Sequence, residues 1–195
     1  MLRTLTLSFA ILVCLASAAL ATPNIVLTNY IMPAGTTGNA IDVFVTGGDA
    51  VQGLGFIIDS NDNQPGGPII TAVDIVGPDT IFFGNNTGQG GSPPPPATKV
   101  KQTTTTASGT VSANGVLGHV TFSTVGVLAG VYDLRMTGMA TAGGGSRTDF
   151  AGIAPTITNG TITVVPEPSS VVLGLFSLAG LSAIAIRKRR ARRTA

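Results

Sequence analysis

The sequence has very few residues of the types that build disulfides, zinc sites and acid–base catalysts. Its 195 residues include one cysteine, one histidine, one glutamate and no tryptophan. Cys14 lies in the apolar N-terminal segment, so the rest of the chain offers neither a disulfide nor a thiolate ligand for zinc. With His119 as the only histidine, neither a Cys–His pair nor a multi-histidine zinc site can be built. We expect His119 to be structural or solvent-facing, on one strand face with Leu117 and Thr121.

Catalytic sequence motifs are also missing. No Gly-x-Ser-x-Gly motif occurs, and the glycine-rich runs lack the strand-to-helix context that phosphate binding needs. The only glutamate, Glu167, lies near the C-terminus. Sequence spacing alone does not bring two aspartates to the separation that acid–base hydrolysis requires. We therefore predict that the protein is not an enzyme and uses no cofactor.

Positive charge is scarce in the central part of the sequence. Six of the eleven lysines and arginines lie between residues 187 and 193. Residues 22–165 contain four basic residues and eight aspartates, which gives this region a formal charge of −4. A mildly acidic region without a basic patch excludes nucleic acid as a partner.

Residues 1–21 have the three parts of a secretory signal peptide. A basic start precedes a short apolar run, and small residues follow, with Ala19 and Ala21 at the −3 and −1 positions of a cut before Thr22. The apolar run is shorter than the roughly 20 residues of a membrane-spanning helix. We therefore predict that the secretion machinery exports the chain and that the signal is cleaved.

Residues 171–186 carry no charge and are followed by a basic tail, residues 187–195. As a helix, the uncharged segment rises about 24 Å, and flanking arginines can extend it to the bilayer surface. Positive charge after a spanning segment places that side in the cytoplasm. The charged residues of the tail are Arg187, Lys188, Arg189, Arg190, Arg192 and Arg193. We therefore predict a transmembrane helix and a membrane-anchored precursor with a cytoplasmic C-terminus.

A short proline motif, Pro166-Glu167-Pro168, stands just before the apolar segment. The order of motif, apolar segment and terminal basic cluster over residues 165–195 resembles the PEP-CTERM sorting signal of bacterial surface proteins. The resemblance implies that an exosortase, a membrane enzyme, recognises and cuts the tail. The two prolines keep the motif extended. A plain C-terminal anchor with a chance Pro-Glu-Pro is the alternative.

The region between the two ends, residues 22–164, has the pattern of one all-β extracellular domain. Short runs rich in β-branched residues alternate with glycine, proline and asparagine, which favours a single β-sandwich of about eight strands. The expected strands span residues 24–30, 41–45, 51–58, 69–76, 98–111, 115–124, 130–137 and 161–165. Residues 84–97, with four consecutive prolines, predict a mobile loop, and residues 142–146 predict a flexible tip.

Several of these strands resemble those of the cohesin-like, jelly-roll-type β-sandwiches. The resemblance rests on Val51-Gln52-Gly53-Leu54-Gly55-Phe56-Ile57-Ile58-Asp59, Gly115-Val116-Leu117-Gly118-His119-Val120-Thr121-Phe122, Gly130-Val131-Tyr132-Asp133-Leu134 and Asn159-Gly160-Thr161-Ile162-Thr163-Val164. It covers most of residues 24–165 and implies a cohesin-like ectodomain. The sequence departs from the family at Ile58-Asp59, where a Tyr-Asp pair is usual, and this departure puts dockerin binding in doubt.

One polar cluster follows the third expected strand. Asp59, Asn61, Asp62 and Asn63 place oxygen atoms at positions that suit calcium. The cluster does not fit a calcium loop of the EF-hand type, because Gln64 and Ile70 stand where glycine and glutamate are required. Aspartate and asparagine are also common in turns. The sequence favours a turn and no metal, with calcium as the alternative.

These features together predict an exported protein of the cell surface or extracellular matrix, with a structural or adhesive role. The alternative is a binding module of cohesin-like fold for a protein or a carbohydrate. Carbohydrate-binding sandwiches usually stack sugar rings on exposed aromatic side chains, and this sequence has no tryptophan and two tyrosines. Besides the exosortase-type enzyme and the secretion machinery, the expected partners are extracellular polysaccharide or other surface proteins.

Overall fold

The computed structural model describes residues 21–136 and 148–166 of the chain. Four expected features lie outside these residues: the signal peptide apart from Ala21, the glycine-rich tip at 142–146, the transmembrane segment and the basic tail. Within the described part, strands account for almost all regular structure, and a single 3-10 turn, η1 (Asn61–Asn63), interrupts them. No helix there has the length and apolar character required to span a bilayer.

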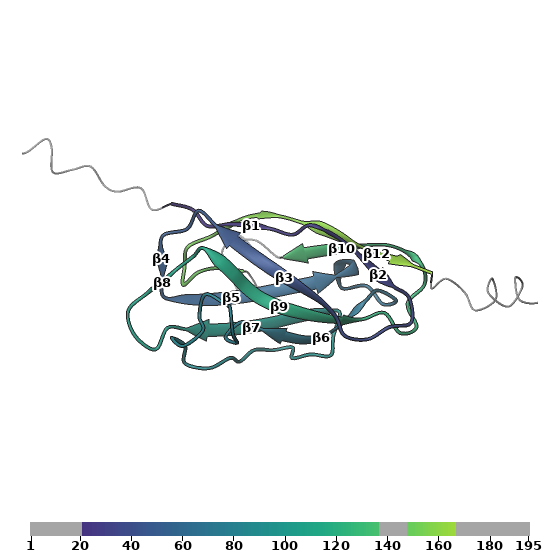
Figure 1. The fold of residues 1–195 in the computed structure, drawn as a ribbon, viewed down its shortest axis with the longest axis horizontal. Helices are drawn as coiled ribbons and strands as arrows, with labels where there is room; N and C mark the ends of the chain where they lie inside the picture. The colour runs from purple at the N-terminus through teal and green to yellow at the C-terminus, as the bar shows by residue number, and fades with distance from the viewer. Residues whose placement is uncertain (1–20, 137–147, 167–195) are drawn as a thin grey trace, which may run out of the picture.

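The described residues form a sandwich of two five-stranded sheets, with a small third sheet at one end (Figure 1). The first sheet has the order β11 (Thr156–Thr158), β1 (Asn24–Val26), β3 (Asn39–Thr46), β9 (Gly115–Ser123), β6 (Ile69–Asp74). The second has the order β2 (Asn29–Pro33), β12 (Gly160–Val165), β10 (Gly130–Met136), β5 (Gly53–Ser60), β7 (Lys99–Thr105). The third pairs β4 (Ala50–Val51) with β8 (Val111–Ser112). The predicted all-β sandwich is thus confirmed.

The core lies between the two large sheets. In β3 the inward residues Ile41, Val43 and Val45 are buried and alternate with exposed Asp42 and Phe44, as expected for a strand with one buried face. The largest fully buried side chains are Phe56, Phe82, Phe122 and Phe150. Because the described residues include no cysteine, this apolar core and the strand hydrogen bonds must hold the domain together without disulfides.

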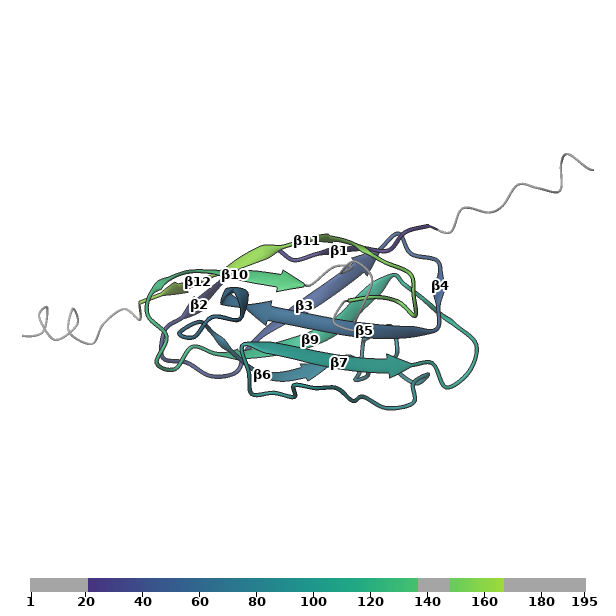
Figure 2. The same ribbon diagram turned by 180° about the vertical axis from the view of Figure 1, so that it is seen from behind.

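On one side of the sandwich, two chain segments cross side by side from the first sheet to the second: one leads from β1 to β2 and the other from β11 to β12. β1 runs parallel to β11, with Ile25 opposite Ile157, and β2 runs parallel to β12, with Ile31 opposite Thr163. Figure 2 shows β1 and β11 side by side at the top of the molecule. A Cβ at Gly160 would collide with the carbonyl oxygen of Thr28, so the crossing requires glycine there.

This crossing corrects the sequence-based strand assignment. Residues 24–30, predicted as one strand, divide into β1 and β2, because the chain changes sheets at Leu27 and Thr28. The short β11 was not predicted. Residues 98–111, also predicted as one strand, divide into β7 and β8 in different sheets.

A bulge between β3 and β9 changes which residues of β9 face the core. Val43 pairs with Gly118 and Phe44 pairs with Val116, so Leu117 has no partner in β3. Leu117 is fully buried, whereas His119 and Thr121 are partly exposed on the other face. The prediction that Leu117 shares a face with His119 is therefore wrong, because the extra residue breaks the alternation.

On the opposite side of the sandwich, β6 and β7 are the edge strands of the two sheets. Residues 84–97, which connect them, were predicted as a mobile excursion, but hydrogen bonds hold this segment against both edges. The amide of Gly90 donates to the carbonyl of Thr103, and the amide of Thr103 donates back. Gln89 ties the same segment to β6: its Nε2 donates to the Val73 carbonyl at 2.6 Å, and its Oε1 accepts from the Ile75 amide at 2.7 Å.

We predict that Gln89→Ala lowers the free energy of unfolding by about 1–2 kcal/mol, because the edge of β6 loses two hydrogen bonds. Urea unfolding measures the loss, and hydrogen exchange should show faster exchange of the Ile75 amide. Gln64→Ala is the matched control, since the Gln64 side chain is exposed and its Nε2 lies 3.5 Å from the Asp62 carbonyl oxygen, at the limit of a hydrogen bond. Equal effects of the two variants would contradict the role assigned to Gln89.

Candidate functional site

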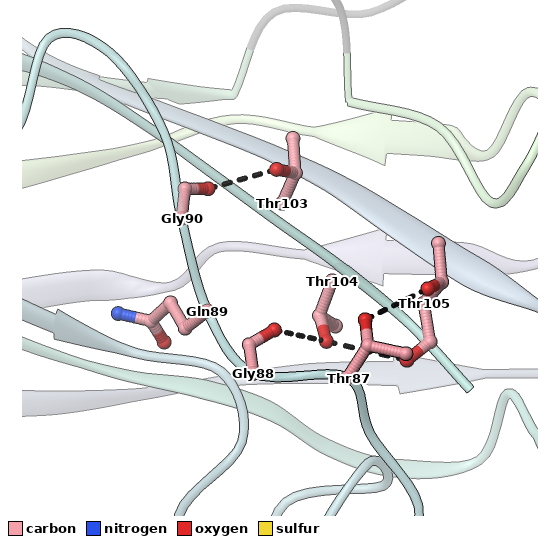
Figure 3. Close-up of a pocket in the computed structure, with 7 residues that line it drawn as sticks. All are labelled: Thr87, Gly88, Gln89, Gly90, Thr103, Thr104 and Thr105. Carbon is pink, nitrogen blue, oxygen red and sulfur yellow. Dashed lines mark hydrogen bonds between the residues drawn. The ribbon is translucent and has the colours of Figure 1, made fainter. Parts of the chain in front are cut away.

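An open groove of about 370 Å³ lies between residues 87–90 and β7. Figure 3 shows its lining. The lining residues are Thr87, Gly88, Gln89, Gly90, Thr103, Thr104 and Thr105. No charged or aromatic side chain takes part, so the groove has neither a catalytic group nor a platform for a sugar ring.

The threonine hydroxyls of this groove bind the protein itself. Thr103 and Thr104 donate to the carbonyls of Gly90 and Gly88, each at 2.8 Å. The hydroxyls of Thr87 and Thr105 lie 2.9 Å apart and bond to each other. Figure 3 also shows the Gln89 side chain turned away from the threonines. The groove is therefore a hydrogen-bonded seam that covers the edge of β7, and such covering protects an edge strand from pairing with another chain.

The imidazole of His119 has an altered protonation equilibrium. Its Nδ1 lies 2.7 Å from Oδ1 of Asp42 on the neighbouring strand β3, and its Nε2 lies 3.1 Å from the carbonyl oxygen of Pro78. Both partners are acceptors, so only the imidazolium can donate to both. The hydrogen bond to Asp42, followed by the one to Pro78, raises the pKa of His119 above its ordinary 6.5 and outweighs desolvation.

This arrangement does not resemble a catalytic dyad. A general base needs one ring nitrogen free to accept a proton from a nucleophile. Here the carbonyl of Pro78 holds the nitrogen that a nucleophile would use. The pair is best described as a surface ion pair, with the His119 side chain 33% and the Asp42 side chain 50% exposed.

The four residues of the calcium alternative lie at the end of β5 and in η1. Asn61 and Asp62 have φ angles of 60° and 53°, the left-handed conformation that these residue types tolerate in turns. Asp62 Oδ1 lies 3.0 Å from a guanidinium nitrogen of Arg135, and Asp59 pairs with Arg135 in the sheet register. In the part of the chain that the structure describes, no three His, Cys, Asp or Glu side chains converge as metal ligands.

The structure also describes the junction between the domain and the sorting motif. β12 ends at Val165, whose carbonyl accepts from the Ala34 amide at 2.8 Å, and Pro166 follows directly. The expected motif therefore begins where the sandwich ends, with no linker. Glu167, Pro168 and the basic tail lie outside the described residues, as does Ala19. At the other end, the Ala21 amide donates to Asp49 at 2.6 Å.

We predict that the His119–Asp42 pair stabilises the fold at low pH. Because the folded pKa is raised, its contribution is complete below about 6.5 and is lost as the pH rises through the higher folded value. The pair is exposed, so the contribution is below about 1 kcal/mol. Unfolding of the wild type, His119→Gln and Asp42→Asn at about pH 5.5 and about pH 8.5 measures it. Parallel pH profiles of the three proteins would contradict the prediction.

Comparison with known proteins identifies two features. Residues 164–190 match the PEP-CTERM protein-sorting motif. The fold resembles the seventh ScaB type I cohesin of Pseudobacteroides cellulosolvens (TM-score 0.53, 18% identity, 76% of this chain and 96% of that one). It also resembles CaCohA2 of Clostridium acetobutylicum (TM-score 0.54, 17% identity, 75% and 92%). No curated protein matches. The chain thus carries a PEP-CTERM sorting motif after a sandwich that is structurally similar to cohesin modules.

Proposed function

We propose that this chain is a non-catalytic protein of the cell surface or extracellular matrix, with a structural or adhesive role. The observation that carries the proposal is the match of residues 164–190 to a protein-sorting motif, which implies export. The match begins within β12 and continues into the proline motif, the apolar segment and the basic residues. A folded domain attached directly to such a signal is the part of the protein that remains outside.

The precursor is held in the membrane by residues 171–186, with the basic tail in the cytoplasm. An exosortase-type enzyme in the membrane then cuts at or near the proline motif and releases the domain to the surface. The motif suits such an enzyme because Pro166 and Pro168 restrict the backbone to extended conformations. Little conformational entropy is then lost when the motif enters a cleft.

A non-catalytic role is supported by the geometry of the polar groups. The only histidine of the chain has an acceptor at each ring nitrogen, and the threonines of the groove bond to the backbone or to each other. These groups hold the fold together, and none is left poised for proton transfer to a bound substrate.

We predict that replacing Pro166-Glu167-Pro168 by three alanines leaves the chain uncut and membrane-bound, whereas the wild type loses residues 171–195. Mass spectrometry of the surface-exposed protein from its native host detects the difference. Ser169→Ala with Ser170→Ala is the matched control, because it changes neighbouring residues and spares the motif. Peptides from residues 173–186 in the mature wild-type protein would show a permanent anchor instead.

The cohesin-like fold favours a second candidate function, a module that binds another protein. A related fold, the third ScaC cohesin of Acetivibrio cellulolyticus, was solved in complex with a ScaB dockerin (TM-score 0.52, 13% identity). Carbohydrate binding has less support, because Phe44 and Phe83 are the only strongly exposed aromatic residues in the described part of the chain. Neither of them lines the groove.

Binding of the purified, labelled mature protein to producer cells separates these roles. If the partner is a surface protein, we expect protease treatment of the cells to abolish binding and glycosidase treatment to leave it intact. The reverse result would identify extracellular polysaccharide as the partner. Binding that survives neither washing nor dilution would contradict an adhesive role.

A further inference from the structure

Exposed apolar side chains gather at one end of the sandwich. Ile31, Val125, Leu128 and Val131 are between 58% and 79% exposed, and they include the three most exposed large apolar residues of the described chain. We call these four residues the apolar end. Isolated apolar residues are normal on a protein surface, but a group of them marks a contact.

The residues of the apolar end come from neighbouring elements. Ile31 of β2 and Val131 of β10 both pair with Thr163 of β12, so they lie in one row across the outer face of the second sheet. Val125 and Leu128 belong to the loop between β9 and β10. Figure 1 shows that this loop and the end of β12 lie at the same end of the long axis.

Hydrogen bonds fix the backbone of this end. The Thr124 hydroxyl donates to the carbonyl of Pro33 at 2.6 Å, and the Gly35 amide donates to the carbonyl of Thr124. The Tyr132 hydroxyl donates to the carbonyl of Leu128 at 2.8 Å. The apolar side chains are therefore presented from an ordered surface, and binding would not require the loop to fold first.

The segments that carry the four side chains contain no charged residue, and the charged residues beside them are paired with one another. Residues 29–38, 123–132 and 160–166 contain no lysine, arginine, aspartate or glutamate.

Asp133, two residues beyond Val131 on the same strand face, and Asp62 of η1 both pair with Arg135, at 2.6 Å and 3.0 Å. Because these charges are already paired, contact at the apolar end leaves no isolated charge to be removed from water, which is the largest obstacle to contact with lipid. An end whose protruding side chains are apolar therefore suits the boundary between lipid headgroups and acyl chains.

The chain leaves the sandwich at this same end. β12 continues from Thr163 to Val165, and Pro166 follows it. Only residues 167–170 separate Pro166 from the apolar segment that begins at Val171. This connection spans at most about 18 Å when fully extended. Once residues 171–186 are in the membrane, the tether keeps the apolar end near the bilayer at a high effective concentration, so a weak contact is sufficient.

We propose that, in the anchored precursor, the apolar end rests on the outer surface of the membrane. The sandwich then stands with its β12 end against the lipid and its opposite end toward the exterior. This contact holds Pro166-Glu167-Pro168 at the depth of the headgroups, where a membrane-embedded enzyme can reach it. The inference rests on the proposed function, because it requires residues 171–186 to be inserted in the bilayer.

Depth-dependent fluorescence quenching tests the contact. The full chain with Cys14→Ser is reconstituted into liposomes that contain spin-labelled lipids, and a fluorophore is attached to one introduced cysteine. Leu128→Cys reports on the apolar end, Phe83→Cys is the matched exposed control, and Leu175→Cys reports on the anchor. Phe83 follows Ile81, which bonds to Val116 near the start of β9, and therefore lies toward the other end of the sandwich.

We expect lipid quenching at positions 128 and 175, and at least roughly twofold weaker quenching at position 83. Quenching at 175 but not at 128 would overturn the membrane contact while the proposed anchor stands. A label at 128 that is shielded from an aqueous quencher but is not quenched by lipid would show a protein surface as the occupant, which also overturns the proposal. Absence of quenching at 175 would contradict both the anchor and the contact.

A second measurement links the contact to processing. The triple variant Ile31→Ser, Leu128→Ser, Val131→Ser should be cut severalfold more slowly than the wild type in the native host. The variant with Phe44→Ser and Phe83→Ser should be cut at the wild-type rate. All five side chains are exposed, so the melting temperatures should remain close to that of the wild type. Equal cutting rates would show that the contact does not position the motif.

Discussion

The structure depends on satisfying the backbone polar groups at the sides of an open sandwich. Two stacked sheets have four edge strands, here β11 and β6 in the first sheet and β2 and β7 in the second. An uncovered edge exposes unpaired amides and carbonyls to other chains. One side is closed by the joint crossing of two chain segments between the sheets. The other is closed by residues 84–97: the hydroxyls of Thr103 and Thr104 in β7 donate to carbonyls of this segment, and Gln89 of the segment bonds to β6. These closures, with the apolar core, hold together a domain that has no disulfide.

The sequence predicted those features that depend on local order. Alternating Ile41, Asp42, Val43, Phe44 and Val45 indicate a strand with one buried face, and the structure shows it. The sorting motif was equally predictable from the sequence, because its parts follow one another along the chain. The match over residues 164–190 covers those same parts. The class of fold and the presence of a sorting motif were therefore predictable.

Other features depend on register between distant residues, which local patterns do not encode. The Asp42–His119 pair forms only because β3 and β9 are neighbours in a particular alignment, and the bulge at Leu117 shifts that alignment by one residue. The role of Gln89 depends on the proximity of two edge strands that belong to different sheets. A proline-rich, glycine-rich sequence resembles a free loop, and nothing in its composition reveals that it is bonded along its length.

The position of β12 determines how the domain carries mechanical load. This strand leads directly into the sorting motif, yet it lies inside its sheet, bonded to β2 on one side and β10 on the other. A force applied between the tail and the opposite end of the sandwich acts along the axis of β12. The hydrogen bonds to the antiparallel partner β10 are nearly perpendicular to that axis. The hydrogen bonds to β2 and those to β10 then resist the force in shear, and many of them bear it at the same time. An edge strand at the attachment point would share the same load over one ladder.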